Sequence, residues 1–386
     1  MLRDLLILCL VAGGVVLVLL ALNMASVPRL SRAGRRAPPA RWPLVSVVIP
    51  ARNEEEAIEK TVRSHLAQDY PLLEVVVVED CSTDRTAEIL GRLEREDVRL
   101  RILPGLDPPP GWLGKPHALY RGSRAARGEL ILFADADVRY HPRALREAVT
   151  VLEGQRLDFL AVIPRFEMEG FWENVLMPNI PLTYFFGPGL LANADRVRFV
   201  AAGGGAGNLV RSGVYAAVGG HEALRSSVID DVHLAFLVKK SGFRCRAFRA
   251  EDRVSVRMYR GFRQVWDGFT KNVAYAFQGV LGTLLITLML LAVVPALLPA
   301  LVLLAALFGA PVGTLETRLA AAGLVMSIAA RTPVALALKH PIWTTATNPL
   351  MVAVWAGIIV RSSYWRFVRK EVRWRGRTYE SRHASF

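Results

Sequence analysis

Two long apolar runs stand toward the ends of the chain, and shorter alternating runs lie between them. Residues 5–22 are almost wholly apolar, and residues 283–308 are apolar apart from two threonines and two prolines. A helix of either length can cross the hydrocarbon core of a bilayer. A cleaved signal peptide is the alternative for the first run. Its arginines mostly follow the run rather than precede it, which favours an uncleaved anchor.

Two weaker apolar segments follow the second run. Residues 319–338 are interrupted by Arg331 and Pro333, and residues 346–360 are short for a span. Three spans after the central region would leave the basic C-terminal tail outside, against the positive-inside rule, whereas two would keep it inside. We therefore expect residues 319–338 to be re-entrant or interfacial.

The central region alternates short apolar stretches with stretches of helical periodicity, which predicts an α/β domain. The expected strands are residues 45–49, 74–78, 100–103, 130–133 and 159–163. The expected helices are residues 54–68, 116–126 and 142–152, with others starting near residues 86 and 230. Asn53 is placed to cap the first helix. Strand–helix–strand units at this spacing predict a Rossmann-like, mostly parallel sheet.

The net charge of +14 comes largely from basic clusters beside the apolar runs. One cluster lies within residues 29–41 and the other within residues 361–377. Lys and Arg beside spans mark the cytoplasmic side and attract anionic lipid. The sequence has no zinc-finger spacing and no aromatic–basic RNA motif, so we expect no nucleic-acid partner. We expect a multi-pass protein of the inner membrane whose catalytic domain faces the cytoplasm.

Two carboxylates follow the expected strand at residues 130–133. Asp135 and Asp137 are two positions apart, so both can face one point beyond the carboxyl end of the strand. Ligands of open α/β sheets bind at that edge. Two carboxylates suit a hard cation, Mg²⁺ or Mn²⁺, which in turn suits a diphosphate. A polar cap after the strand is the alternative.

Several stretches together resemble the family 2 glycosyltransferases, the inverting GT-A-fold enzymes that use nucleotide sugars. The family's strand-Pro-x-x-Asn-Glu corresponds to residues 48–54, and its Asp-Asp-x-Ser-x-Asp to residues 79–84. Its Gly-Lys and Ala-Asp-Ala-Asp occur at residues 114–115 and 134–137, and its Glu-Asp-x-x-Leu-Ala occurs at residues 230–235 with Asp first. The chain is most similar to membrane-anchored members that transfer one sugar to a lipid, such as ceramide glucosyltransferase and hopanoid- or carotenoid-associated enzymes.

The resemblance implies how these stretches would bind the donor. Asp137 would hold a divalent cation, Mg²⁺ or Mn²⁺, and Asp135 would lie near the ribose or the metal. Lys115 would place a positive charge beside the diphosphate. An ordinary loop lysine is the alternative for Lys115.

The resemblance also implies a nucleoside contact and a general base. Asp80 would accept a hydrogen bond from a uracil-like base, and Pro50 and Glu54 would line the nucleoside. Asp231 is the expected base that removes the proton of the acceptor hydroxyl. Asp230 would position Asp231 or cap the helix that is expected to start near residue 230. Turn-forming or helix-capping carboxylates are the alternative for these acids.

The chain departs from the family in one motif. Processive and ceramide-type members carry Gln/Arg-x-x-Arg-Trp before the last spans, but no Arg precedes Trp266 here. Aromatic and charged residues mix at helical spacing around Arg263 and Trp266, so we expect an interfacial segment near the acceptor. The missing motif argues against polymer synthesis. We therefore expect a nucleotide-sugar donor and a lipid acceptor; a polysaccharide synthase and a non-catalytic transferase-fold protein are the alternatives.

The expected organisation has six parts. They are an N-terminal anchor (1–24), a basic Pro-rich linker (25–43), a GT-A domain (44–258), an interfacial segment (259–280), a C-terminal transmembrane region (281–361) and a basic cytosolic tail (362–386).

Overall fold

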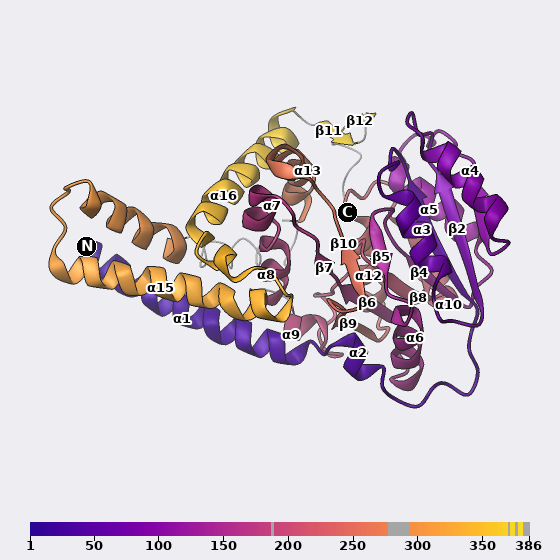
Figure 1. The fold of residues 1–386 in the computed structure, drawn as a ribbon, viewed down its shortest axis with the longest axis horizontal. Helices are drawn as coiled ribbons and strands as arrows, with labels where there is room; N and C mark the ends of the chain where they lie inside the picture. Colours follow the sequence, from indigo (N-terminus) through magenta and orange to yellow (C-terminus); the bar gives the residue numbers. More distant parts are fainter. Residues whose placement is uncertain (187–188, 277–293, 370, 375–376, 381–386) are drawn as a thin grey trace. The chain divides into compact units, whose positions relative to one another are not determined.

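The computed structural model describes residues 1–186, 189–276, 294–369, 371–374 and 377–380 (Figure 1). The chain forms two compact units. A sheet unit comprises Val27–Glu167, Leu191–Met258 and Arg369–Phe386, and a helical unit comprises Met1–Ser26, Met168–Leu190 and Tyr259–Val368. Residues 168–190 therefore pack with the apolar helices, although they fall inside the range expected for the GT-A domain.

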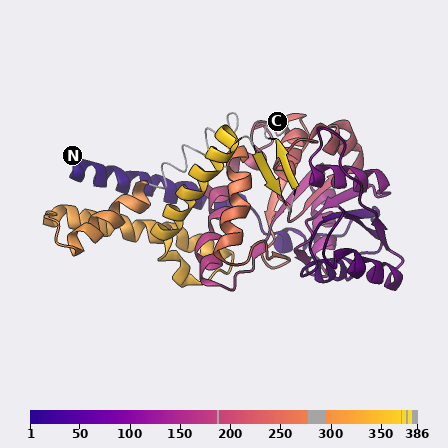
Figure 2. The ribbon, with the colours of Figure 1, turned by 90° about the horizontal axis from the view of Figure 1, so that it is seen from above.

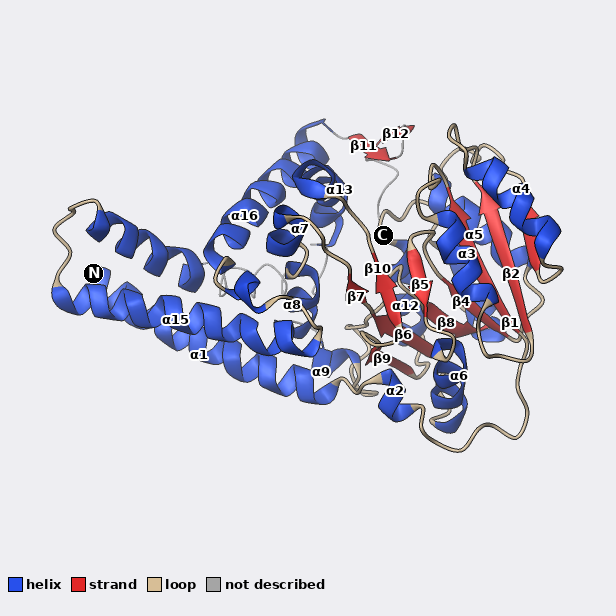
Figure 3. Ribbon diagram, in the orientation of Figure 1, coloured by secondary structure: helices blue, strands red, loops and turns tan. Residues whose placement is uncertain are grey.

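The sheet unit is built on a seven-stranded sheet with the order β3-β2-β1-β4-β8-β6-β9 (Figure 3). The strands are β1 (Val45–Ala51), β2 (Leu73–Glu79), β3 (Leu100–Leu103), β4 (Leu130–Phe133), β6 (Phe159–Ile163), β8 (Asn208–Arg211) and β9 (Cys245–Arg249). Nearly every residue of β1, β2 and β4 is buried, as expected for strands covered on both faces. The predicted mostly parallel sheet is confirmed.

Helices pack against this sheet, and two small sheets complete the unit. The helices are α2 (Leu30–Ala33), α3 (Ile58–Leu66), α4 (Thr86–Glu96), α5 (Gly114–Ala125), α6 (Ala144–Gly154), α10 (Ser212–Ala217), α11 (Gly220–Ala223) and α12 (Asp230–Lys240). One small sheet joins β5 (Val138–Tyr140), β10 (Val254–Val256) and β7 (Arg165–Phe166); the other pairs β11 (Glu371–Trp374) with β12 (Arg377–Glu380).

Strand β8 runs against its neighbours and carries a distant loop to one edge of the sheet. It pairs antiparallel with β4, and Asn208 lies opposite Phe133. An antiparallel strand begins at the edge where its neighbour ends. The loop at residues 203–207 therefore arrives beside the carboxyl end of β4.

The first predicted helix begins later than expected, whereas β3 and β6 have their predicted bounds. Helix α3 starts at Ile58, and Asn53 does not cap it. Asn53 has a φ of 54°, in the left-handed region that Asn tolerates. Its Oδ1 accepts a hydrogen bond from the Thr83 N–H at 2.8 Å. The side chain therefore bridges the loops after β1 and β2 instead of closing a helix end.

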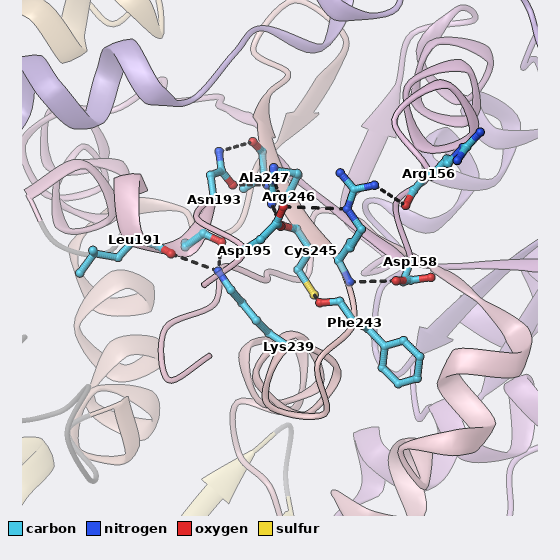
Figure 4. A network of polar contacts seen from close by, with 12 residues as sticks. Arg156, Asp158, Leu191, Asn193, Asp195, Lys239, Phe243, Cys245, Arg246 and Ala247 are labelled. Carbon is cyan, nitrogen blue, oxygen red and sulfur yellow. Dashed lines mark hydrogen bonds and ion pairs between the residues drawn. The ribbon is translucent and has the colours of Figure 1, made fainter. Parts of the chain in front are cut away.

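The outer strand β9 is covered by side chains (Figure 4). Asn193 pairs as a strand would: its Nδ2 donates to the Ala247 carbonyl at 3.1 Å, and its Oδ1 accepts the Ala247 N–H at 2.7 Å. Arg246 pairs with Asp195 at 2.5 Å, and Lys239 of α12 donates to the main chain of the same segment. Covering an edge in this way removes a template for unwanted pairing. It also fixes α12, whose first turn carries Asp230 and Asp231.

Among the residues that the structure describes, two helices of the helical unit are long and apolar enough, by length and composition, to cross a membrane. They are α1 (Leu2–Ser26) and α15 (Thr314–Ala337), which pack along each other (Figures 1 and 2). The apolar run expected at residues 283–308 lies partly outside the described residues, and its described part is a helix over Val294–Leu307. The other elements are α7 (Phe171–Leu176), α8 (Asn179–Phe186), α13 (Gly261–Ala276), α16 (Asn348–Tyr364), a 3₁₀ turn (Ile342–Thr345) and a π-helical turn (Trp365–Arg369), with α9 (Gly189–Ala192) at the unit boundary.

Helix α15 is continuous through the segment expected at residues 319–338, up to Ala337. Pro333 lies inside the helix, and Arg331 is buried. Arg331 Nη2 donates to the Val175 carbonyl at 3.2 Å, and its Nη1 lies 3.5 Å from Thr347 Oγ1. A charged residue that faces neighbouring helices is compatible with a membrane helix. Neither residue interrupts the helix, and the assignment of this segment as re-entrant or interfacial stays a prediction.

Candidate active site

Three adjacent parallel strands, β2, β1 and β4, end at one edge of the sheet, and a predicted site residue follows each. Asp80 follows β2, Glu54 lies beyond β1, and Asp135 lies beyond β4. Pro50 is the penultimate residue of β1, and the half-buried Asp137 lies just before β5. The carboxyl ends of parallel strands form the ligand-binding edge of open α/β sheets. The topology therefore brings these residues to a common edge.

Polar contacts lock the loops after β1 and β2 to each other. Arg52 Nη1 donates to the carbonyl oxygens of Asp80 and Cys81 at 2.5 and 2.9 Å. The Glu54 N–H donates to Thr86 Oγ1 at 2.8 Å. Asp80 itself is buried. These bonds fix the backbone from which Glu54 and Asp80 project.

Lys115 is the centre of a charged cluster. It stands in the first turn of α5, and its Nζ lies 2.7 Å from Asp135 Oδ1 and 4.0 Å from Asp230 Oδ1. Burial alone would lower the pKa of this lysine, but the carboxylates of Asp135, Asp230 and Asp231 together raise it well above its ordinary value. The ammonium is therefore charged at neutral pH and links the loop after β4 to helix α12.

Asp230 and Asp231 open helix α12 in different environments. Burial raises the pKa of Asp230, but Lys115 and His221 outweigh burial and hold it below its ordinary value. Burial raises the pKa of the half-buried Asp231 to about 6, with the charges of Asp230 and Asp135 adding to it against the pull of Lys115. Neighbouring carboxylates with separated pKa values divide into a permanent anion and a group that exchanges a proton. Of the two, Asp231 has the pKa nearer to neutral pH.

The loop before β8 closes tightly over this cluster. The Asp135 N–H donates to the Gly205 carbonyl at 2.8 Å, and a Cβ on Gly205 would lie 2.0 Å from Asp135 Oδ2. A side chain at position 205 would therefore displace the Asp135 carboxylate. Asn208 Nδ2 donates to the Asp231 carbonyl at 3.0 Å, and its Oδ1 accepts the Gly204 N–H at 3.2 Å. The loop therefore joins Asp135 and Asp231.

Residues 46–211 match the model of the family described as Glycosyl transferase family 2. The chain carries a glycosyl transferase family 2 domain. Two curated relatives are 4,4'-diaponeurosporenoate glycosyltransferases. The protein of Staphylococcus haemolyticus (strain JCSC1435) is 26% identical over 233 residues, which are 60% of this chain and 61% of the relative. That of Staphylococcus aureus (strain USA300) is 28% identical over 235 residues, 60% of each chain. The chain thus spans about 60% of the length of these relatives.

A solved structure shares the fold of the whole chain. The mannosyltransferase PcManGT from Pyrobaculum calidifontis, in complex with GDP-Man and Mn²⁺, has a TM-score of 0.61 and 22% sequence identity. The likeness covers 96% of this chain and 100% of that one. The predicted GT-A fold is confirmed for the family 2 domain.

The carboxylates at this edge of the sheet fit a metal ion that is bound partly by the protein and partly by the phosphates of a substrate. Within the ranges that the structure describes, no group of three or more His, Cys, Asp or Glu side chains is arranged to hold a metal ion. Mg²⁺ is typically held by one or two carboxylates together with substrate phosphates, and Asp135 and Asp137 supply two. Asp135, Asp230 and Asp231 share the single ammonium of Lys115. A divalent cation would offset the excess negative charge, so the residues fit Mg²⁺ or Mn²⁺.

Two buried residues of the sheet unit, Tyr215 and His221, were not predicted. His221 Nε2 lies 3.6 Å from Asp230 Oδ2, and Tyr215 Oη lies 2.9 Å from His221 Nδ1. In the sequence, neither His221 nor Tyr215 stands at a recognisable motif spacing from Asp230 and Asp231. The pair of glycines before His221 was the one available signal, because paired glycines mark a turn that places the next side chain.

Arg263 and Trp266 lie on α13 in the helical unit. Arg263 is exposed, and Trp266 stacks on Phe262 with ring centroids 5.5 Å apart. The guanidinium of Arg361 lies 5.9 Å from the Trp266 ring, and Trp172 contacts Phe262 edge-on at 4.9 Å. Tryptophan with flanking arginines is typical of a bilayer interface. The predicted role of Arg263 and Trp266 near the acceptor stays a prediction.

Proposed function

We propose that this chain transfers a single sugar, with inversion, from a nucleotide sugar to the hydroxyl of a membrane lipid. The observation that carries the proposal is the cluster of Lys115, Asp135, Asp230 and Asp231, in which Lys115 and Asp135 belong to the glycosyl transferase family 2 match. It combines charges suited to a metal diphosphate with a carboxylate whose basicity suits an acceptor hydroxyl. The donor we propose is a UDP-sugar.

The donor half of the site is the edge formed by β2, β1 and β4. Asp80 and Glu54, with Pro50, are proposed to take the nucleoside, and Lys115 the diphosphate. Asp135 and Asp137 would hold Mg²⁺ or Mn²⁺, which when bound acts as a Lewis acid on the departing diphosphate. The complex of the Pyrobaculum mannosyltransferase with GDP-Man and Mn²⁺ supports a nucleotide donor and a divalent metal. GDP-mannose is therefore the alternative donor to test.

The acceptor half depends on Asp231. With a pKa of about 6, this carboxylate is ionised at neutral pH and is more basic than an ordinary one. Its Oδ1 accepts the Val232 N–H at 2.8 Å, which leaves Oδ2 to take the proton. The acceptor oxygen forms the new bond at the anomeric carbon as the bond to the diphosphate breaks on the opposite face. The hydroxyl proton passes to Asp231.

A lipid acceptor and a membrane location are parts of the same proposal. The apolar helices α1 and α15 and the aromatic face of α13 support them, and so do the relatives named for 4,4'-diaponeurosporenoate. We place the chain in the inner membrane as a multi-pass protein, with the family 2 domain and the basic tail in the cytoplasm. Cysteine substitution in the tail, followed by labelling with an impermeant reagent, tests the orientation. Labelling in intact cells would contradict it.

The test of the function uses the full chain in membranes with radiolabelled UDP-hexoses or GDP-mannose. We expect label in a chloroform-extractable product that mass spectrometry identifies as a lipid carrying one hexose. Transfer from GDP-mannose alone would change the donor assignment. Label confined to a water-soluble polymer would indicate a polysaccharide synthase. Donor binding without turnover under any condition would indicate a non-catalytic transferase fold.

A further inference from the structure

Asp230 is the first member of a buried network of polar side chains that continues through His221 to Tyr215. We propose that His221, aligned by Tyr215, is a positioning residue that holds the Asp230 carboxylate toward Lys115, so that Asp231 alone accepts the proton of the acceptor. The inference rests on the proposed function and adds two residues to it. Neither residue belongs to the stretches through which the sequence resembles the family.

The two oxygens of Asp230 face different partners. Oδ1 lies 4.0 Å from Lys115 Nζ, and Oδ2 lies 3.6 Å from His221 Nε2. Asp230 is 2% exposed and His221 is 1% exposed, so water does not substitute for either contact. Neighbouring carboxylates share a proton unless one of them is held as the anion. Fixing Asp230 from both sides leaves Asp231 as the member that exchanges a proton.

The hydrogen bonds around His221 determine where its proton lies. Tyr215 Oη lies 2.9 Å from His221 Nδ1, and it also accepts the His221 backbone N–H at 2.9 Å. An ionised Asp230 can only accept a hydrogen bond, so the tautomer of His221 that pairs with Oδ2 carries its hydrogen on Nε2. In a neutral imidazole Nδ1 is then the acceptor, and the Tyr215 hydroxyl donates to it. Ser123 Oγ, 3.0 Å from Tyr215 Oη, extends the chain.

The backbone is shaped to bring these two rings together. Gly220 has a φ of 49°, and a Cβ on it would lie 2.4 Å from Tyr215 Cζ. Glycine is therefore required for the imidazole to reach the phenol hydroxyl. Phe133, the last residue of β4, contacts the Tyr215 and His221 rings at centroid distances of 5.2 and 4.8 Å. The Tyr215 and His221 rings therefore pack against the end of β4, the strand that leads to Asp135.

The test compares His221→Leu with His221→Gln and Tyr215→Phe in the full chain. His221→Leu should lower kcat about 10–100-fold, the range expected when a reacting group is misplaced, with KM for donor and acceptor changed less than about twofold. His221→Gln keeps an N–H that can face Asp230 and should recover most of kcat. Tyr215→Phe keeps the ring and should give an intermediate kcat.

The control is His65→Leu, which removes an equally buried imidazole from α3 and lies outside the proposed site. Its kcat below the melting temperature should equal that of the wild type. A His221→Leu kcat within twofold of wild type, or no rescue by Gln, would overturn the inference while the proposed function stands. If His221→Leu does not fold, Tyr215→Phe decides, and an unchanged kcat there overturns it. A wild type that transfers no sugar would overturn both proposals.

Discussion

Replacing Asp231 with Asn removes the proposed base and preserves the shape of the site. The Asn side chain can still accept the Val232 N–H, which lies 2.8 Å from Asp231 Oδ1. General base catalysis contributes about 10²–10⁴ in rate, which corresponds to about 3–5 kcal/mol of activation free energy. We expect kcat to fall by this factor while KM for the donor changes little, because the donor half of the site is untouched.

The pH dependence follows from the pKa of about 6. The base works only when ionised, so it is about 90% active at pH 7 and about 10% active at pH 5. The wild-type kcat/KM should therefore fall toward a tenfold loss per pH unit below pH 6, and the residual activity of Asp231→Asn should lack this acid limb. Transfer of labelled sugar to lipid from pH 5 to pH 8 measures both.

The same pKa has the opposite consequence for stability. Because it lies above the ordinary value of 3.8, the folded state binds more protons than the unfolded state between pH 3.8 and about 6. Stability therefore falls as pH rises through this window, by up to about 3 kcal/mol, and the cost persists above it. We expect Asp231→Asn to be catalytically impaired and yet to melt at a higher temperature than the wild type at pH 7, with the difference disappearing near pH 4.

The control is Asp69→Asn, which removes an exposed carboxylate that pairs with Arg146 at 2.9 Å. It should leave kcat and its pH profile unchanged. The reasoning about Asp231 is refuted if Asp231→Asn keeps more than a tenth of the wild-type kcat, or if the wild type has no acid limb near pH 6.

Changes at the sheet edge separate the roles of Lys115, the glycine loop and the proposed metal pair. Lys115→Met leaves Asp135 and Asp230 without their shared cation, so KM for the donor should rise at least about tenfold; an unchanged donor KM contradicts a diphosphate contact. Gly205→Ala places a methyl group 2.0 Å from Asp135 Oδ2 and should weaken Mn²⁺ binding, measured by calorimetry, by about tenfold or more; wild-type binding would separate Asp135 from the metal. Asp137→Ala should abolish transfer, and EDTA should do the same to the wild type until Mn²⁺ is restored; full activity in EDTA would remove the metal from the proposal.

The fold was largely predictable because parallel strands are buried on both faces. Their apolar runs are therefore continuous and bounded by polar turns, which is why β3 and β6 have their predicted ends. The errors occur where a local rule has a competitor in the folded chain. Asn53 can cap a helix or bridge to Thr83, and the sequence does not distinguish the two. Pro333 usually ends a helix, but packing against neighbouring helices keeps α15 continuous.

The two halves of the candidate site differ in how far the sequence predicts them. The donor half follows from topology alone, since a parallel sheet brings the ends of β2, β1 and β4, and with them Asp80, Glu54 and Asp135, to one edge. The acceptor half requires β8 to run in reverse, and the four residues of β8, Asn208–Arg211, carry no signal of strand direction. Only that reversal places Asn208 beside the end of β4, where its amide holds the Asp231 carbonyl at 3.0 Å. His221 and Tyr215 come with the segment that follows β8, so their contact with Asp230 could be found only in the folded chain.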